Sequence, residues 1–163
     1  MVPYKDLFIA LDKSDVRYLV AGGFAVNFHH INRATADLDV VVHLTEENII
    51  AFDKVMTELG YRPRLPVTGK EFAKKENRDI WINEKNMVVF SYIHPKNFFE
   101  LIDVFVEEPM PFESLYQNRL VVEAFGVTIP VVGIDDLITM KQNTGRDKDL
   151  FDANMLRKKK NEL

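Results

Sequence analysis

The chain has 163 residues, no cysteine and a formal net charge of −4, with 47% hydrophobic and 28% charged residues. This length suits one domain with a proper core, and the missing cysteines exclude disulfides, thiolate metal sites and cysteine nucleophiles. No signal-peptide h-region and no membrane-length apolar run is present, so we expect a cytoplasmic protein with no membrane partner. The acidic balance argues against a general duplex-DNA binder.

The first sixty residues predict helices and strands in alternation. Apolar residues recur at helical spacing in some stretches, and short apolar or β-branched runs mark two buried strands. Gly22-Gly23 ends the first strand, Thr45 is a good N-cap, and Gly60 is a good helix end. The predicted order is a helix at 4–13, a strand at 17–21, a helix at 24–31, a strand at 38–43 and a helix at 46–59.

The rest of the chain is less regular. Residues 61–79 hold two prolines, one glycine and many charges, which predicts a loop, with a short helix near 71–78 as the alternative. The other predicted elements are strands at 87–93, 98–106, 121–125 and 127–131, the last two as a hairpin around Gly126, and helices at 134–144 and 147–159 divided by Gly145. Together these elements predict an α/β (or α+β) fold, a mixed sheet flanked by helices. We expect a single domain over 1–163, with its core at about 16–133 and C-terminal helices at 134–160.

Asp37 and Asp39 form the most informative motif. Side chains alternate along a strand, so both carboxylates share one face while Leu38 and Val40 face the core. Neighbouring carboxylates repel each other unless a cation lies between them or one is protonated. Oxygen ligands suit Mg²⁺ or Mn²⁺. The alternative is a pair of solvated aspartates at the entry of a strand.

Two further features bear on this motif. Asp103 interrupts an apolar strand, where an ionised side chain is costly unless it is paired, metal-bound or at an exposed end. On a neighbouring strand it would complete a two-metal site for in-line phosphoryl transfer, the alternative being an edge residue that faces water. Gly22-Gly23 lets a phosphate approach the backbone, the alternative being a simple tight turn.

In order and spacing these residues resemble the nucleotidyltransferase superfamily, whose fold is like the catalytic part of DNA polymerase β. The matching residues are Val20-Ala21-Gly22-Gly23, then Asp37-Leu38-Asp39, then Ile102-Asp103-Val104. The Arg33-x-Thr35-x-Asp37-x-Asp39 form is similar to a bacterial branch that includes abortive-infection (AbiEii-type) toxins and antibiotic-modifying enzymes. Residues 134–141 and 145–152 resemble the closing helices of that branch.

The resemblance implies roles for particular residues. Asp37, Asp39 and Asp103 would be catalytic and would bind two Mg²⁺ (or Mn²⁺) ions. The implied nucleotide-binding residues are Gly22, Gly23, Arg33, Thr35, Lys141, Arg146 and Lys148. Two interpretations of Arg33 stay equal alternatives. The side chain would contact either the γ-phosphate or the carboxylates, or it would form a structural salt bridge to Asp37.

The implied function is transfer of NMP from an NTP to an acceptor hydroxyl on tRNA, a protein or a small molecule. Many active relatives have Ser at the position of Gly23, and many have a further helical domain after the closing helices. The alternative is therefore a catalytically weak or inactive nucleotide-binding module, or a toxin–antitoxin component; we also consider a homodimer that completes the cleft. For an RNA acceptor, the basic stretches 70–78 and 157–160 are the first candidates for contact.

The aromatic residues divide into two expected groups. Trp81 has polar neighbours in the sequence and is the candidate for base stacking. The residues expected in the core are Phe90, Tyr92, Phe98, Phe99 and Phe105.

Overall fold

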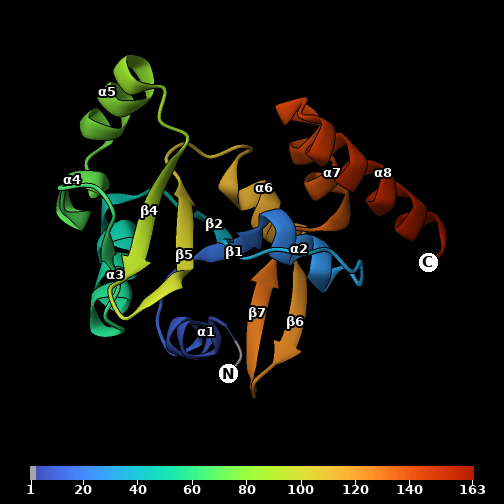
Figure 1. Cartoon of the computed structure of the whole chain (residues 1–163), viewed down its shortest axis with the longest axis horizontal. Helices are drawn as coiled ribbons and strands as arrows, with labels where there is room; N and C mark the ends of the chain where they lie inside the picture. Colours follow the sequence, from blue (N-terminus) through green and yellow to red (C-terminus); the bar gives the residue numbers. More distant parts are fainter. Residues whose placement is uncertain (1–2) are drawn as a thin grey trace.

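The computed structural model describes residues 3–163 and has eight helices and seven strands within them (Figure 1). The helices are α1 (Lys5–Asp12), α2 (Gly22–Phe28), α3 (Glu46–Glu58), α4 (Gly69–Ala73), α5 (Lys75–Lys85), α6 (Phe112–Gln117), α7 (Ile134–Thr144) and α8 (Asp147–Asn161). The strands are β1 (Tyr18–Ala21), β2 (Leu38–Val42), β3 (Arg62–Pro63), β4 (Val89–His94), β5 (Asn97–Phe105), β6 (Leu120–Ala124) and β7 (Val127–Val131). The predicted alternation of helices and strands over the first sixty residues is confirmed.

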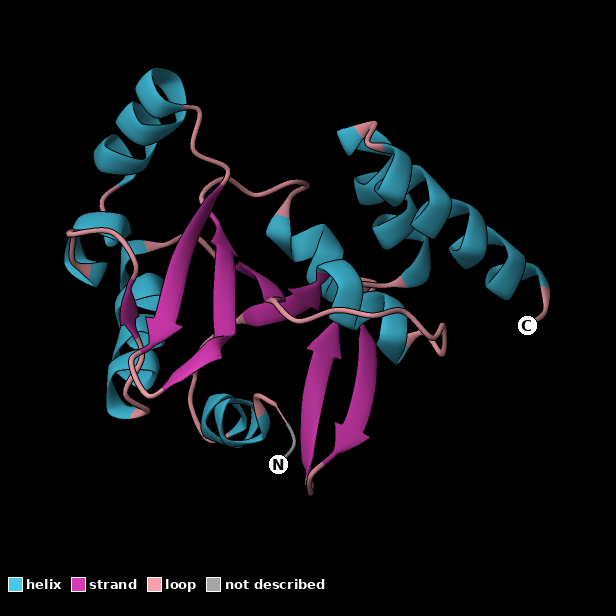
Figure 2. Cartoon of the chain, in the orientation of Figure 1, coloured by secondary structure: helices cyan, strands magenta, loops and turns pink. Residues whose placement is uncertain are grey.

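All seven strands join one mixed sheet in the order β3-β4-β5-β2-β1-β7-β6 (Figure 2). β2 runs parallel to β5 and β1 runs parallel to β7, whereas the other neighbours are antiparallel. The predicted mixed sheet flanked by helices is therefore confirmed, as is the hairpin around Gly126, which has φ +75°.

Helices cover the sheet from both sides. Phe52 of α3 packs edge-on against Tyr92 of β4, which places α3 on one face. Leu137 and Met140 of α7 line a cleft with Phe105 of β5, on the opposite face. α7 and α8 lie side by side at one end of the molecule (Figure 1). Within the described chain, no helix has both the length and the apolar character needed to cross a membrane.

The loop predicted over 61–79 is wrong for its second half, where the alternative of a helix near 71–78 is confirmed by α4 and the start of α5. Thr68 begins α4 with a capping box, in which its hydroxyl accepts from the Glu71 amide and the Glu71 side chain accepts in return. α5 then continues past the predicted stretch to Lys85. Arg78 is the one buried residue of α5, so the helix has no apolar stripe from which a sequence pattern could have revealed it.

Two more differences concern short elements. α2 begins at Gly22 itself, because φ +62° at this glycine turns the chain directly from β1 into the helix. α6 was not predicted; its six residues bury Phe112 and Leu115, which is too short a run to show helical periodicity.

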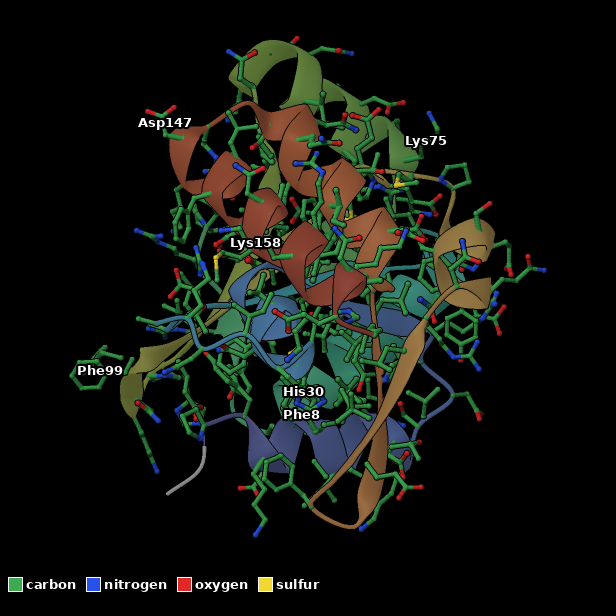
Figure 3. All side chains as sticks on the ribbon, turned by 90° about the vertical axis from the view of Figure 1, so that its right-hand side faces the viewer. Phe8, His30, Lys75, Phe99, Asp147 and Lys158 are labelled. Atoms are coloured by element: carbon green, nitrogen blue, oxygen red, sulfur yellow. The ribbon has the colours of Figure 1, made fainter. Side chains whose placement is uncertain are left out.

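The aromatic prediction is partly wrong. Phe90 and Tyr92 are buried as expected, but Phe98 and Phe99 are each 88% exposed. Figure 3 shows Phe99 at the edge of the molecule, pointing outward from the β4–β5 hairpin. Trp81 stacks on Phe90, with ring centroids 5.8 Å apart, so its ring already has a partner in the fold.

Candidate functional site

Asp39 and Asp103 lie opposite each other on neighbouring parallel strands. The register of β2 and β5 pairs Asp39 with Asp103 between two buried apolar pairs. Adjacent strands are about 4.8 Å apart, so the two carboxylates share one small region of the sheet. Ser91 of β4 continues the row, because it pairs with Asp103 and its hydroxyl donates to Asp103 Oδ1 at 2.6 Å.

Asp37 and Gly22 complete the surroundings of Asp39. Asp37 is exposed and lies one residue before β2, whereas Asp39 is half-buried. A Cβ placed on Gly22 would lie 2.0 Å from Asp39 Oδ2. The Asp39 carboxylate therefore rests directly on the Gly22 backbone, and this contact, together with the positive φ, restricts the position to glycine.

Within the described residues 3–163, no positively charged group is in direct contact with the Asp39 carboxyl. Burial raises its pKa to about 6; the charges of Asp103 and Asp37 add to this effect, and Lys141 opposes it from a distance. No hydrogen bond from residues 3–163 contributes. Burial also raises the pKa of Asp103, against the opposing hydrogen bond from Ser91. The site is thus electrostatically frustrated, which is common where a cation or substrate binds.

A divalent cation fits this donor set. Mg²⁺ and Mn²⁺ prefer carboxylate oxygens, and Asp39 offers a desolvated carboxylate that no described residue engages. Across residues 3–163, however, no three His, Asp or Glu side chains already form a cluster suited to a metal. The site supplies the right ligand types without a preformed cage.

Arg33 and Thr35 cover Gly23. A Cβ on Gly23 would lie 2.4 Å from Arg33 Nη1 and 2.6 Å from Thr35 Oγ1. This crowding gives a physical reason for glycine, and against any larger residue such as serine, at this position. The suggested salt bridge from Arg33 to Asp37 is wrong, because Arg33 Nε donates instead to Asp152 Oδ1 of α8, at 3.0 Å.

A buried ionic network ties α7 to α8 behind the site. Lys141 Nζ lies 3.2 Å from Asp149 Oδ1 and 3.0 Å from Asp152 Oδ2. Asp149 also accepts from Thr144 Oγ1 at 2.6 Å and from Arg146 Nε at 2.7 Å. Burial acts to raise the pKa of Asp149, but the donors from Thr144 and Lys141 outweigh it and the pKa falls. The network therefore holds the Lys141 side chain in place between two carboxylates of α8.

Two clefts flank Asp39. The first, the polar cleft, has a volume of about 250 Å³ and is lined by every predicted site residue except Gly22 and Asp103. The second, the apolar cleft, has a volume of about 330 Å³ and contains Gly22. Its apolar lining is Val88, Phe105, Pro109, Leu137 and Met140. Both clefts include Asp39, Lys141 and Arg146, so a polar and an apolar compartment meet at the same carboxylate.

Tyr4 connects the two segments that carry the acids. Its hydroxyl donates to Ala36 O at 2.7 Å and accepts from Leu101 N at 3.1 Å. Ala36 precedes Asp37, and Leu101 lies two residues before Asp103. Burial raises the pKa of Tyr4 to about 12, so the hydroxyl stays protonated and keeps donating.

A separate cavity of about 370 Å³ lies beside Tyr4. It lacks the acidic and basic groups that meet at Asp39.

Sequence reasoning missed four residues of this arrangement: Tyr4, Ser91, Asp149 and Asp152. Ser91 could have been found only from the β4–β5 register, which fixes its place opposite Asp103. Tyr4 and Asp152 bind partners on distant segments, which no local pattern encodes. The partners of Asp149 lie within eight residues of it, but the turn between α7 and α8 decides that they meet.

The comparisons with known proteins agree on the fold. A lincosamide antibiotic adenylyltransferase, LnuA, solved with lincomycin bound, matches 96% of this chain and 97% of its own, with 15% identity and a TM-score of 0.59. A Thermotoga maritima protein provisionally named a nucleotidyltransferase matches 98% and 91%, with 15% identity and a TM-score of 0.59. The antibiotic-resistance factor ANT(2″)-Ia matches 94% and 79%, with 14% identity and a TM-score of 0.57.

The chain therefore has the nucleotidyltransferase fold. No protein-family model and no curated protein matches the sequence. The specific likeness to abortive-infection toxins stays a prediction.

Proposed function

We propose that this chain transfers a nucleoside monophosphate from an NTP to an acceptor hydroxyl and releases pyrophosphate. The observation that carries the proposal is the half-buried carboxylate of Asp39, directly opposite Asp103 and without a hydrogen-bond or ion-pair partner among residues 3–163. Such a site is unfavourable in a protein that binds nothing, and it suits one that receives a metal-bound triphosphate.

In this proposal the three acids have different roles. Asp37 and Asp39 would hold two Mg²⁺ (or Mn²⁺) ions together with Asp103. The ions, when bound, neutralise the phosphate charge and orient the attacking and leaving oxygens. Asp103 is suited to accept the proton of the acceptor hydroxyl, because burial raises its pKa while Ser91 fixes one carboxylate oxygen.

The basic side chains of the polar cleft would bind the triphosphate. Lys148 is exposed, and the Arg146 side chain is 74% exposed, with only its Nε engaged by Asp149. These two groups are free to contact phosphate oxygens. Lys141 and Arg33 are held by acids of α8, so they would present fixed positive charge near the site. The Gly22-Gly23 backbone would lie against the phosphates.

The apolar cleft would receive the nucleoside. Phe105 and Met140 offer it apolar contact on the far side of Asp39 from the polar cleft. A nucleotide spanning both clefts would place its α-phosphate beside Asp39, where transfer requires it. Neighbouring folds include enzymes that adenylylate antibiotics, which supports a hydroxyl-bearing acceptor of some kind.

A second candidate is a nucleotide-binding module of the same fold that turns over weakly or not at all, as in a toxin–antitoxin component. The crowding of Gly23 by Arg33 and Thr35 favours it, because these side chains occupy space above the turn. A triphosphate would then have to displace them, or would bind beside them.

Labelled transfer distinguishes the two candidates. The protein is incubated with Mg²⁺, an α-labelled NTP and three acceptors in parallel: tRNA, total protein and a lincosamide. The proposal predicts labelling of an acceptor that Asp39→Asn abolishes and that Asp15→Asn, on an exposed loop, leaves intact. NTP with Mg²⁺ should raise the melting temperature in both candidates. Stabilisation without labelling favours the module, and the absence of both contradicts the proposal.

A further inference from the structure

The row of site residues continues past Ser91 to the edge of the sheet. Arg64 N donates to Ser91 O at 2.8 Å, so β3 pairing extends one residue beyond the strand and sets Arg64 opposite Ser91. Residues directly opposite each other share a face of the sheet. Asp39, Asp103, Ser91 and Arg64 therefore form one transverse row on a single face. Arg64 lies close enough for its charge to act on Asp103, where it partly opposes the burial that raises the pKa of this carboxyl.

Arg62 extends this positive charge along β3. It lies two residues from Arg64, about 6.6 Å away along a strand, and alternation puts it on the same face. The register pairs it with Ile93, which faces the same way as Ser91. Both arginines are exposed, and neither forms an ion pair with another residue in 3–163.

The two arginines lie on the far side of the acids from the proposed triphosphate cations. Arg146 and Lys148 line the polar cleft with Asp37 and Asp39, whereas Arg64 approaches Asp103 from the β3 edge. A molecule that presents its hydroxyl to Asp103 from this edge meets Arg64 first. Two unpaired arginines in a protein of net charge −4 are a local feature that attracts an anion.

We propose that Arg64 and Arg62 bind backbone phosphates of a nucleic-acid strand whose terminal hydroxyl is the acceptor. This inference rests on the proposed function and specifies its acceptor. At the end of a nucleic-acid strand the reacting hydroxyl lies close to a backbone phosphate. This pair matches the site, because Asp103 would meet the hydroxyl while Arg64 binds the phosphate. Arginine also suits phosphate oxygens, since its planar fork donates two parallel hydrogen bonds.

The same charges disfavour other acceptors. A polycationic acceptor such as an aminoglycoside would be repelled by Arg64 and Arg62. A neutral small molecule would gain nothing from either arginine. The basic stretches 70–78 and 157–160 are less suited to this role, because several of their cations are already engaged: Lys74 with Glu46, Arg78 with backbone carbonyls, and Lys160 with Asp135.

The test uses a fluorescent single-stranded oligoribonucleotide of about twenty residues, with a matched oligodeoxyribonucleotide as a second arm. Binding is followed by anisotropy over a range of salt, and transfer from an α-labelled NTP is followed on the same strands. Arg64→Gln should weaken binding and raise KM about tenfold, with kcat nearly unchanged because the contact exists before and during reaction. The slope of log affinity against log salt should fall by about 0.7 for one lost phosphate contact.

The matched control is Lys54→Gln on α3, which removes one exposed charge on the opposite side of the sheet. It should change neither binding nor KM. If no strand binds, or if Arg64→Gln and Lys54→Gln behave alike, the inference is wrong. A wild-type preference for lincosamide or aminoglycoside over both strands also overturns it while leaving the proposed function intact. Failure of NTP and Mg²⁺ to stabilise the protein would instead count against the proposed function.

Discussion

Replacing Asp39 by asparagine should make the folded protein more stable at neutral pH. The asparagine side chain would fill the same space without the desolvated charge. The carboxyl has a pKa of about 6 in the fold against an ordinary value of 3.8. The folded protein therefore binds this proton more tightly than the unfolded chain does. Its stability falls as pH rises from about 4 to 6, and the loss persists at higher pH.

The magnitude follows from the shift in pKa. About two units correspond to at most about 3 kcal/mol of unfolding free energy. Urea unfolding of wild type and Asp39→Asn, in the absence of divalent ions, should show no difference near pH 4 and a gain for the variant that levels off above about pH 7. Asp15→Asn, at an exposed position, should stay within about 0.5 kcal/mol of wild type throughout.

Added Mg²⁺ gives the complementary result. It should stabilise the wild type above about pH 6, where Asp39 is ionised, and should have little effect on Asp39→Asn. A variant that is less stable than wild type at every pH would refute the reasoning, because it would mean that the carboxylate has favourable partners in the fold.

Three further variants test the supporting contacts. Tyr4→Phe removes the hydroxyl that joins the acid-bearing segments; it should cost about 1–2 kcal/mol in urea unfolding and lower kcat more than it changes KM for NTP, and an unchanged kcat would exclude a positioning role. Asp152→Asn leaves Lys141 and Arg33 short of a partner and should destabilise by about 3 kcal/mol; calorimetry that finds no loss would mean that the buried network contributes nothing. Gly23→Ser should cost about 1–3 kcal/mol, because its side chain displaces Arg33, and a melting temperature equal to that of wild type would show that the space is open.

The fold was predictable where local chemistry is strong. Alternating and helical apolar patterns located the strands and helices around the acids, and Thr45 marked the start of α3, where its hydroxyl accepts from Asn48 N at 3.2 Å. α5 was hidden because its surface is polar almost throughout. Its beginning depends on the neighbouring turn and on the side chain of Arg78, which donates to the carbonyls of Phe72 and Ala73.

The site was predictable as a set of residues but not as a geometry. The acids could be named from their spacing, whereas the pairing of Asp39 with Asp103 depends on the parallel register of β2 and β5. Sequence spacing also suggested Asp37 as a partner for Arg33. The chain instead supplies Asp152 from α8, since the packing of α8 against α7 brings that acid to the loop before β2.

A dual-label experiment tests the central claim most directly. The protein receives Mg²⁺ and an NTP labelled at either the α- or the γ-phosphate, with a hydroxyl-bearing acceptor. Nucleotidyl transfer predicts that the α label enters the acceptor and the γ label leaves in pyrophosphate, with both lost in Asp103→Asn. Transfer of the γ label to the acceptor, or transfer of the α label that survives in Asp103→Asn, would contradict the account.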